Sequence, residues 1–301
     1  MDETQSGANA TGYRVLARKY RPRTFPDLIG QDAMVRTLTN AFASGRIAQG
    51  FMLTGVRGVG KTTTARLIAR ALNYGDKPTI DMAVYGPHCE AILESRHMDV
   101  IEMDAASNTG VDNMREIIDS VRYAPVQARY KVYIIDEVHM LSKSAFNALL
   151  KTLEEPPPHV KFIFATTEIN KVPVTILSRC QRFDLKRLDA ALLASHYAGI
   201  AAREGVEAEA DALAMIARAA EGSVRDGLSL LDQAIAYGEG KVKAADVASM
   251  HVVCGALSLV TGGLMCVISA RLRGGVVAQT ADSPAGLRVS LLGTEAGAAA
   301  K

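Results

Sequence analysis

The stretch Gly55-Val56-Arg57-Gly58-Val59-Gly60-Lys61-Thr62 lies between two apolar segments of different periodicity. Its spacing is that of a phosphate loop, in which a glycine and four further residues precede Gly-Lys-Thr. The glycines let backbone amides point at phosphate oxygens, Lys61 adds a positive charge, and the Thr62 hydroxyl can bind Mg²⁺. An apolar run at 51–54 predicts a buried strand before the loop, and apolar residues at helical spacing over 62–72 predict a helix after it. The stretch therefore predicts a nucleotide-phosphate site at a helix N-terminus.

The bulk composition describes a globular chain with room for more than one domain. The 301 residues are 49% hydrophobic and 22% charged, with a formal net charge of +2. Positive charge is concentrated near the start, because residues 13–46 hold seven Lys or Arg against Asp27 and Asp32. This excess is compatible with DNA, a triphosphate, an acidic partner or simply a solvated face. The four cysteines are scattered and the first eleven residues are polar, so we expect a reducing cytoplasm and a flexible tail over 1–12.

Strands and helices alternate through the first part of the chain. Further strands are predicted at 99–103, 131–137 and 160–165, and helices at about 30–45, 111–121 and 142–154, the last capped by Ser142. This alternation predicts an α/β fold with a mostly parallel sheet covered by helices on both faces, over 13–185. From about 186 the pattern becomes helical alone, at 189–203, 208–220 and 223–237, which predicts a small helical domain ending near 249.

Two carboxylates follow the apolar run at 131–135. Asp136 is placed to hold magnesium through its water shell, and Glu137 to orient and polarise the water that attacks a γ-phosphate. Carboxylates also end strands at solvent for no catalytic reason. With a phosphate loop upstream, the pair favours an ATPase with its own catalytic glutamate over a small GTPase.

Taken together, the motifs resemble those of the AAA+ clamp-loader ATPases, most closely the gamma/tau subunits of bacterial DNA polymerase III. The resemblance covers about residues 13–249 and rests on the phosphate loop and five further motifs: Tyr20-Arg21-Pro22, Ile29-Gly30-Gln31, Asp136-Glu137-Val138-His139-Met140-Leu141, Asn147-Ala148-Leu149-Leu150-Lys151-Thr152-Leu153-Glu154-Glu155-Pro156-Pro157 and Thr175-Ile176-Leu177-Ser178-Arg179-Cys180. It implies an AAA+ fold with a helical lid, and ATP and Mg²⁺ held by residues Gly55 to Thr63 with Asp136.

The resemblance also implies roles for single residues. Thr166 matches the first sensor near the γ-phosphate, Arg179 matches an arginine that reaches the ATP site of the neighbouring subunit, and Arg225 matches the second sensor on the lid. Residues on the adenine side would be Tyr20, Arg21, Ile29 and Gly30. The implied partners are the delta and delta prime subunits, copies of the same chain, the sliding clamp and primed DNA, with no membrane and no polymerase chemistry in this chain.

Two regions depart from the family pattern. The family usually binds a structural zinc through four cysteines in the insertion at 74–98, but here this insertion holds only Cys89, with His88 and His97 nearby. We therefore expect no zinc, although a further carboxylate or a partner's ligand would be an alternative. After residue 249 the family continues into a collar, whereas residues 250–270 here carry no charge. This tail (250–301) is interpreted as a sequence foreign to the family, with a divergent helical pair or a membrane span as alternatives.

Other functions remain open at this stage. A non-hydrolysing structural subunit of the same assembly is disfavoured by Lys61, Thr62, Asp136 and Glu137, because such subunits usually lose these residues. Another AAA+ DNA motor, such as the Holliday-junction helicase, is disfavoured by the motifs at 147–157 and 178–180.

Overall fold

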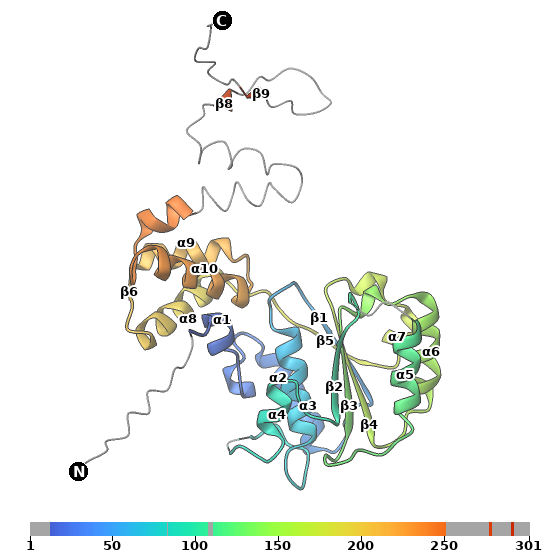
Figure 1. Ribbon diagram of the computed structural model, residues 1–301. Coiled ribbons are helices and arrows are strands. Elements are labelled where there is room, and N and C mark those ends of the chain that lie inside the picture. The colour runs from blue at the N-terminus through green and yellow to red at the C-terminus, as the bar shows by residue number, and fades with distance from the viewer. Residues whose placement is uncertain (1–12, 83, 108–110, 251–276, 279–289, 292–301) are drawn as a thin grey trace, which may run out of the picture.

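A five-stranded parallel sheet forms the centre of the computed structural model (Figure 1), which describes residues 13–82, 84–107, 111–250, 277–278 and 290–291. The strand order is β2-β3-β4-β1-β5, and every neighbouring pair is parallel. The strands are β1 (Gly50–Thr54), β2 (Val100–Asp104), β3 (Lys131–Asp136), β4 (Val160–Thr166) and β5 (Gln181–Asp184). The predicted α/β fold is confirmed, and β5 adds an edge strand that the sequence analysis does not single out.

Helices cover both faces of the sheet, as alternation of strand and helix predicts. Alternate residues of β4 divide between two cores: Ile163 and Ala165 face one, and Phe162 and Phe164 the other. The first core is closed by α2 (Asp32–Ala43), α3 (Lys61–Leu72) and α4 (Cys89–Leu93), and the second by α5 (Val111–Ser120), α6 (Lys143–Glu154) and α7 (Val174–Leu177). The Ser142 hydroxyl caps α6 by accepting a hydrogen bond from the Ala145 amide. Short 3-10 turns occupy η1 (Phe25–Asp27), η2 (Val138–Met140) and η3 (Ile169–Lys171).

A third core lies in the helical part of the chain. It is built by α8 (Ala190–Arg203), α9 (Ala210–Ala219), α10 (Val224–Tyr237) and a helical stretch at 244–250. Strand β6 (Glu207–Ala208), which follows α8, pairs in parallel with β7 (Lys241–Val242), which follows α10. Helix α1 (Leu16–Lys19) packs here as well, with Leu16 in this core and its amide donating to Asp232 on α10. The segment before the sheet is thus attached to the helical lobe.

The insertion at 74–98 is organised around a buried arginine. Arg70 is 1% exposed, its Nε lies 2.9 Å from Cys89 Sγ, and it donates to the Met82 and Arg23 carbonyls. Its guanidinium also lies 4.9 Å from the centre of the Tyr85 ring. Among the residues that the structure describes, no group of three or more His, Cys, Asp or Glu is arranged to hold a metal ion.

The C-terminal tail prediction falls largely outside the described residues. Beyond residue 250, only β8 (Val277–Ala278) and β9 (Ser290–Leu291) are described, as an antiparallel pair. Within the described part of the chain, no helix has the length and apolar character needed to cross a membrane.

Candidate nucleotide-binding site

The candidate site lies at the carboxyl edge of the sheet, where β1 and β3 end. The phosphate loop connects β1 to α3, and its glycines adopt a backbone that other residues avoid, with φ of +74° at Gly58 and +108° at Gly60. A side chain at Gly58 would collide with the helical lobe, because a Cβ there would stand 2.0 Å from the Oγ of Ser223, the residue that caps α10. The loop therefore presents backbone at the N-terminus of α3, which favours an anion.

Lys61 is buried inside the loop that precedes it. The residue is 6% exposed, and its Nζ donates to the carbonyls of Gly55 at 3.0 Å and Val56 at 3.1 Å. Burial lowers the pKa of Lys61, while the nearby charges of Glu137 and Asp136 act in the opposite direction. A triphosphate would offer stronger acceptors than these carbonyls, so the lysine is well placed to exchange them for phosphate oxygens.

Thr62 and Asp136 form a pair of oxygen ligands next to Lys61. The Thr62 hydroxyl donates to Asp136 Oδ2 at 2.5 Å, and the other carboxylate oxygen of Asp136 accepts from the Glu137 amide at 2.9 Å. A hydroxyl and a carboxylate are the ligands with which Mg²⁺ is held in phosphate-loop proteins. These two residues therefore fit the magnesium site that the sequence predicts.

Glu137 follows β3 in a left-handed backbone conformation. Its φ is +45° and its ψ is +44°, which is uncommon for a residue with a side chain and clusters at functional positions. Its Oε2 accepts from the Thr167 amide at 3.2 Å and from the Thr167 hydroxyl at 3.0 Å. The carboxylate is thus turned toward the end of β4, at the rim of the cleft.

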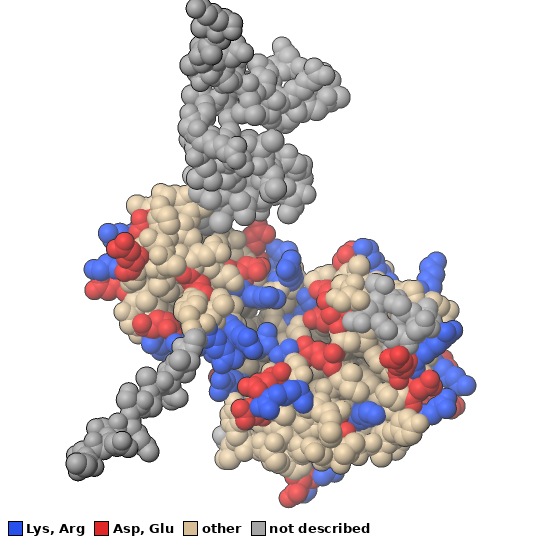
Figure 2. Space-filling view, in the orientation of Figure 1, with Lys and Arg blue, Asp and Glu red and all other residues tan. Residues whose placement is uncertain are grey.

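A cleft of about 1690 Å³ connects these residues to the helical lobe. This is larger than a typical small-ligand pocket and sufficient for a nucleoside triphosphate. Figure 2 shows Lys and Arg side chains gathered where the two lobes meet, and those that line the cleft are Arg18, Lys19, Arg21, Arg23, Arg57, Lys61, Arg203 and Arg225. Burial lowers the pKa of Arg21, and the charges of Arg66, Arg225 and Arg18 lower it further against the opposing effect of Glu102. The cleft therefore favours a multiply charged anion.

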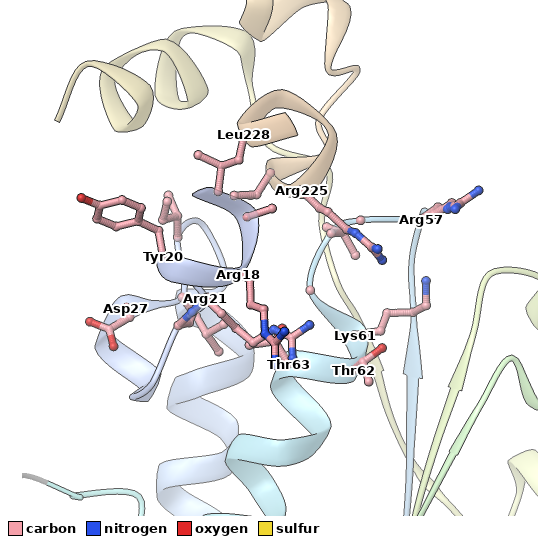
Figure 3. A pocket seen from close by; sticks show the side chains of 18 of the residues that line it. Arg18, Tyr20, Arg21, Asp27, Arg57, Lys61, Thr62, Thr63, Arg225 and Leu228 are labelled. Carbon is pink, nitrogen blue, oxygen red and sulfur yellow. The ribbon is translucent and has the colours of Figure 1, made fainter. Parts of the chain in front are cut away.

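The structure brings most of the predicted site residues into this cleft. Its lining includes Tyr20, Arg21, Ile29, residues 56–63, Asp136, Glu137 and Arg225. Figure 3 shows Arg225 reaching from α10 toward the loop, whereas the ring of Tyr20 extends away from Lys61. The Tyr20 hydroxyl donates to Glu204 at 2.5 Å. The cleft also takes in Arg18, His196 and Leu228, which the sequence analysis does not propose as site residues. Arg18 belongs to the basic segment noted there, and the other two had no motif.

Four predicted residues are not part of the cleft lining. Gly55 and Gly30 lie just outside it, and Thr166 is fully buried at the end of β4, one residue before the lining residue Thr167. Arg179 follows α7 and donates to Glu154 Oε1 at 2.6 Å and to the Thr175 carbonyl at 2.6 Å. Among the contacts that the described residues make, this arginine therefore touches neither the phosphate loop nor the carboxylates of Asp136 and Glu137 in its own chain.

The fold and the site together define a P-loop nucleotide-binding protein of the AAA+ type. Solved structures of the Thermotoga maritima RuvB Holliday junction branch migration motor share the fold, with a TM-score of 0.58 and 21% identity over 78% of this chain and 72% of that chain. At this identity the likeness shows the fold alone.

Family models and curated sequences place the chain more narrowly. The model "DNA polymerase III, delta subunit" matches residues 30–189, and the model "DNA polymerase III clamp loader subunit, ATPase lid domain" matches 193–240. Over 238 residues the chain is 51% identical to the DNA polymerase III subunit tau of Escherichia coli, covering 79% of this chain and 37% of that protein. It is 47% identical to the subunit gamma of Buchnera aphidicola subsp. Acyrthosiphon pisum, covering 79% and 66%. The chain belongs to the clamp-loader subunit family of bacterial DNA polymerase III, and it spans little more than a third of the length of its longer relatives.

Proposed function

We propose that this chain is the ATPase subunit of a DNA polymerase III clamp loader, which uses ATP to place a sliding clamp on primed DNA. The observation that carries the proposal is the convergence of Lys61, Thr62, Asp136 and Glu137 at one cleft in a chain of this family. A subunit with only a structural role has no need of all four. This proposal places the protein in the cytoplasm, with the chromosome.

Each residue receives a part in the reaction. Lys61 and the loop amides bind the β- and γ-phosphates, and Glu137 orients the attacking water. Thr62 and Asp136 would hold Mg²⁺, which supplies positive charge to the phosphates when bound. Thr166 and Arg225 would respond to the γ-phosphate from β4 and from the lid. Tyr20, Arg21, Ile29 and Gly30 would surround the adenine side, and Arg179 would act in the site of a neighbouring subunit.

The partners follow from the same proposal. Delta and delta prime subunits, further copies of this chain, the sliding clamp and primed DNA are expected to assemble with it. Contacts to DNA would be made mainly to backbone phosphates, so they would be independent of sequence and sensitive to salt.

Two substitutions test the proposal. Lys61→Ala is expected to weaken ATP binding roughly 10- to 100-fold, because it removes a charged donor from the phosphates. Glu137→Gln is expected to keep ATP binding and to lower turnover by about 100-fold or more, because the amide is a poor proton acceptor. ATP affinity and phosphate release would be measured for the chain alone and with the companion subunits, clamp and primed DNA. Lys77→Ala, at an exposed lysine, is the control for loss of a charge.

Two outcomes would contradict the proposal. A wild-type chain that binds no adenine nucleotide would contradict it outright. Turnover by Glu137→Gln equal to that of wild type would leave a nucleotide-binding protein whose catalytic residue is elsewhere.

A further inference from the structure

A histidine that none of the proposed roles uses lies between the predicted catalytic residues. His139 belongs to η2, two residues after Glu137, and its side chain is 6% exposed. Its ring lies near the carboxyl ends of β3 and β4, which meet at the same edge of the sheet. A buried imidazole needs polar partners for both nitrogens.

The partners of His139 all belong to the catalytic edge. Nδ1 lies 3.0 Å from Thr166 Oγ1 and 3.4 Å from Glu137 Oε2. Nε2 lies 3.4 Å from Glu168 Oε1, and Glu168 is itself held by Lys171 at 2.8 Å. The ring thus contacts the predicted sensor, the predicted water-orienting carboxylate and a surface carboxylate.

These contacts determine what the Thr166 hydroxyl can do. Thr166 Oγ1 already accepts a hydrogen bond from the Glu168 amide at 3.0 Å. If His139 carries hydrogen on Nδ1, the ring donates to the same oxygen and the hydroxyl hydrogen of Thr166 remains free for a phosphate oxygen. If Nδ1 is bare, it takes that hydrogen for itself. The Glu137 oxygen lies 3.4 Å from Nδ1 and the Glu168 oxygen lies 3.4 Å from Nε2. Each carboxylate favours hydrogen on the nitrogen that it faces, because a lone pair there would face a negative charge.

We propose that His139 is a positioning residue that aims the Thr166 hydroxyl at the γ-phosphate and keeps it in register with Glu137. The inference rests on the proposed ATPase function and adds a residue to it. His139 itself does not line the cleft. Its loss should therefore affect the rate of hydrolysis and leave nucleotide binding in place.

Three variants of His139 separate positioning from packing. His139→Ala removes both contacts, His139→Asn places an amide near the position of Nδ1, and His139→Gln places one near the position of Nε2. In the assembled complex with clamp and primed DNA, we expect kcat to fall roughly 10- to 100-fold for the Ala and Gln variants, as for a misplaced catalytic group. The Asn variant should stay within about fivefold of wild type on the same reasoning. KM and the ATP dissociation constant should change less than about threefold throughout, since Lys61 and the loop amides, which bind the phosphates in the proposed function, are untouched.

A double-substitution cycle identifies the residue through which His139 acts. Because the effect passes through the Thr166 hydroxyl, Thr166→Ala and the pair Thr166→Ala with His139→Ala should have the same kcat. The matched control is His159→Ala, at the opposite end of β4, where the ring contacts only the Val121 carbonyl in the contacts that the described residues make. Melting temperature is recorded for every variant.

The possible outcomes separate this inference from the function on which it rests. Equal loss of kcat in the Asn and Gln variants, or multiplying losses in the double variant, would overturn the role of His139 even if Lys61→Ala weakens ATP binding as expected. Absence of ATP hydrolysis in wild type would instead remove the proposed function. If His139→Ala does not fold, the contrast between Asn and Gln decides.

Discussion

Lys161 is a buried lysine without a carboxylate partner among the contacts that the described residues make. Lys161 is the second residue of β4 and is 3% exposed. Its Nζ donates to the carbonyls of Ile47 at 3.3 Å and Ala48 at 3.0 Å. Its ammonium also lies 5.2 Å from the centre of the Tyr130 ring. Burial lowers the pKa of Lys161 to about 8. The folded protein therefore releases this proton at a lower pH than the unfolded chain does.

This shift predicts how stability depends on pH. Below pH 8 both states hold the proton and the cost of burying the charge is fully present; between pH 8 and 10.5 the unfolded chain binds more proton, so folding is favoured as pH rises. Lys161→Met should raise the free energy of unfolding at pH 7, and its advantage should shrink by up to about 1.4 kcal/mol per pH unit in that window. Urea unfolding from pH 7 to 10.5 measures this, with exposed Lys77→Met as control. A constant difference between Lys161→Met and wild type would contradict the assignment.

Cys180 contributes to the arginine motif through packing. Burial raises the pKa of its thiol to about 12, so it stays protonated, and its Sγ would stand 2.9 Å from a Cβ added at Gly50. The residue after Arg179 is thus fixed against the start of β1. Packing of Cys180 therefore holds the backbone next to Arg179 in place, while the partly exposed side chain of Arg179 can exchange its partner.

At the scale of elements, the phosphate loop and α10 touch directly. The Gly58 carbonyl accepts from the Arg225 amide at 3.4 Å, and Ser223 caps α10 by accepting from the Asp226 amide at 3.1 Å. Because Gly58 has no side chain, its backbone can pack directly against the side chain of Ser223. We expect the position of the lid to follow the conformation of the loop.

Gly58→Ala tests this contact, and the chain offers a matched control. Gly58 and Gly45 have similar φ, +74° and +67°, but a Cβ at Gly58 meets Ser223 Oγ at 2.0 Å, whereas at Gly45 nothing lies within 4 Å. Both variants should lose about 1–2 kcal/mol of stability from backbone strain. Only Gly58→Ala should also lower ATP affinity, by about tenfold, a loss that corresponds to 1.4 kcal/mol of the 1–3 kcal/mol expected for overpacking. Removing Ser223 Oγ by Ser223→Ala should restore part of that affinity. Equal ATP affinity of Gly58→Ala and Gly45→Ala would argue against coupling.

In the whole molecule, Arg179 lies at the surface and does not line the cleft of its own chain. Its side chain is one-third exposed and paired with Glu154, an arrangement that an incoming phosphate could compete with. An exposed pair of this kind contributes at most about 1 kcal/mol, so it is easily exchanged. The position suits an arginine that serves a neighbouring subunit.

Arg179→Ala should therefore separate binding from turnover by assembly state. The isolated variant should bind ATP as wild type does, because Arg179 does not line its own cleft. In the complex, hydrolysis should fall on the order of 1000-fold, as for loss of a trans-acting arginine. Arg182→Ala, which loses only a surface pair with Asp184, is the control. Mixing Arg179→Ala with Lys61→Ala subunits and measuring phosphate release shows whether one chain completes the site of another. Full activity of Arg179→Ala in the complex would reject the role.

Much of the fold and of the candidate site could be predicted, because these features depend on patterns in neighbouring residues. The phosphate loop, the strand at 131–136 and the helix capped by Ser142 each have a continuous signal in neighbouring residues. Strand β5 has none: among Gln181, Arg182, Phe183 and Asp184 only the phenylalanine is buried, as befits a strand at the edge of a sheet. The attachment of Leu16 to α10 depends on residues more than 200 positions away.

Short stretches of the sequence are enough to predict the α/β fold and the phosphate loop, because period, spacing and glycine content are local properties. Only the tertiary structure decided that His139 meets Thr166, 27 residues later, and that Gly58 meets Ser223. The parallel register of β3 and β4 brings the first pair together, and the packing of α10 on the loop brings the second. Such contacts arise from the pairing of strands and from the packing of the helical lobe on the loop. Neither has a signal in the local sequence around the residues that meet.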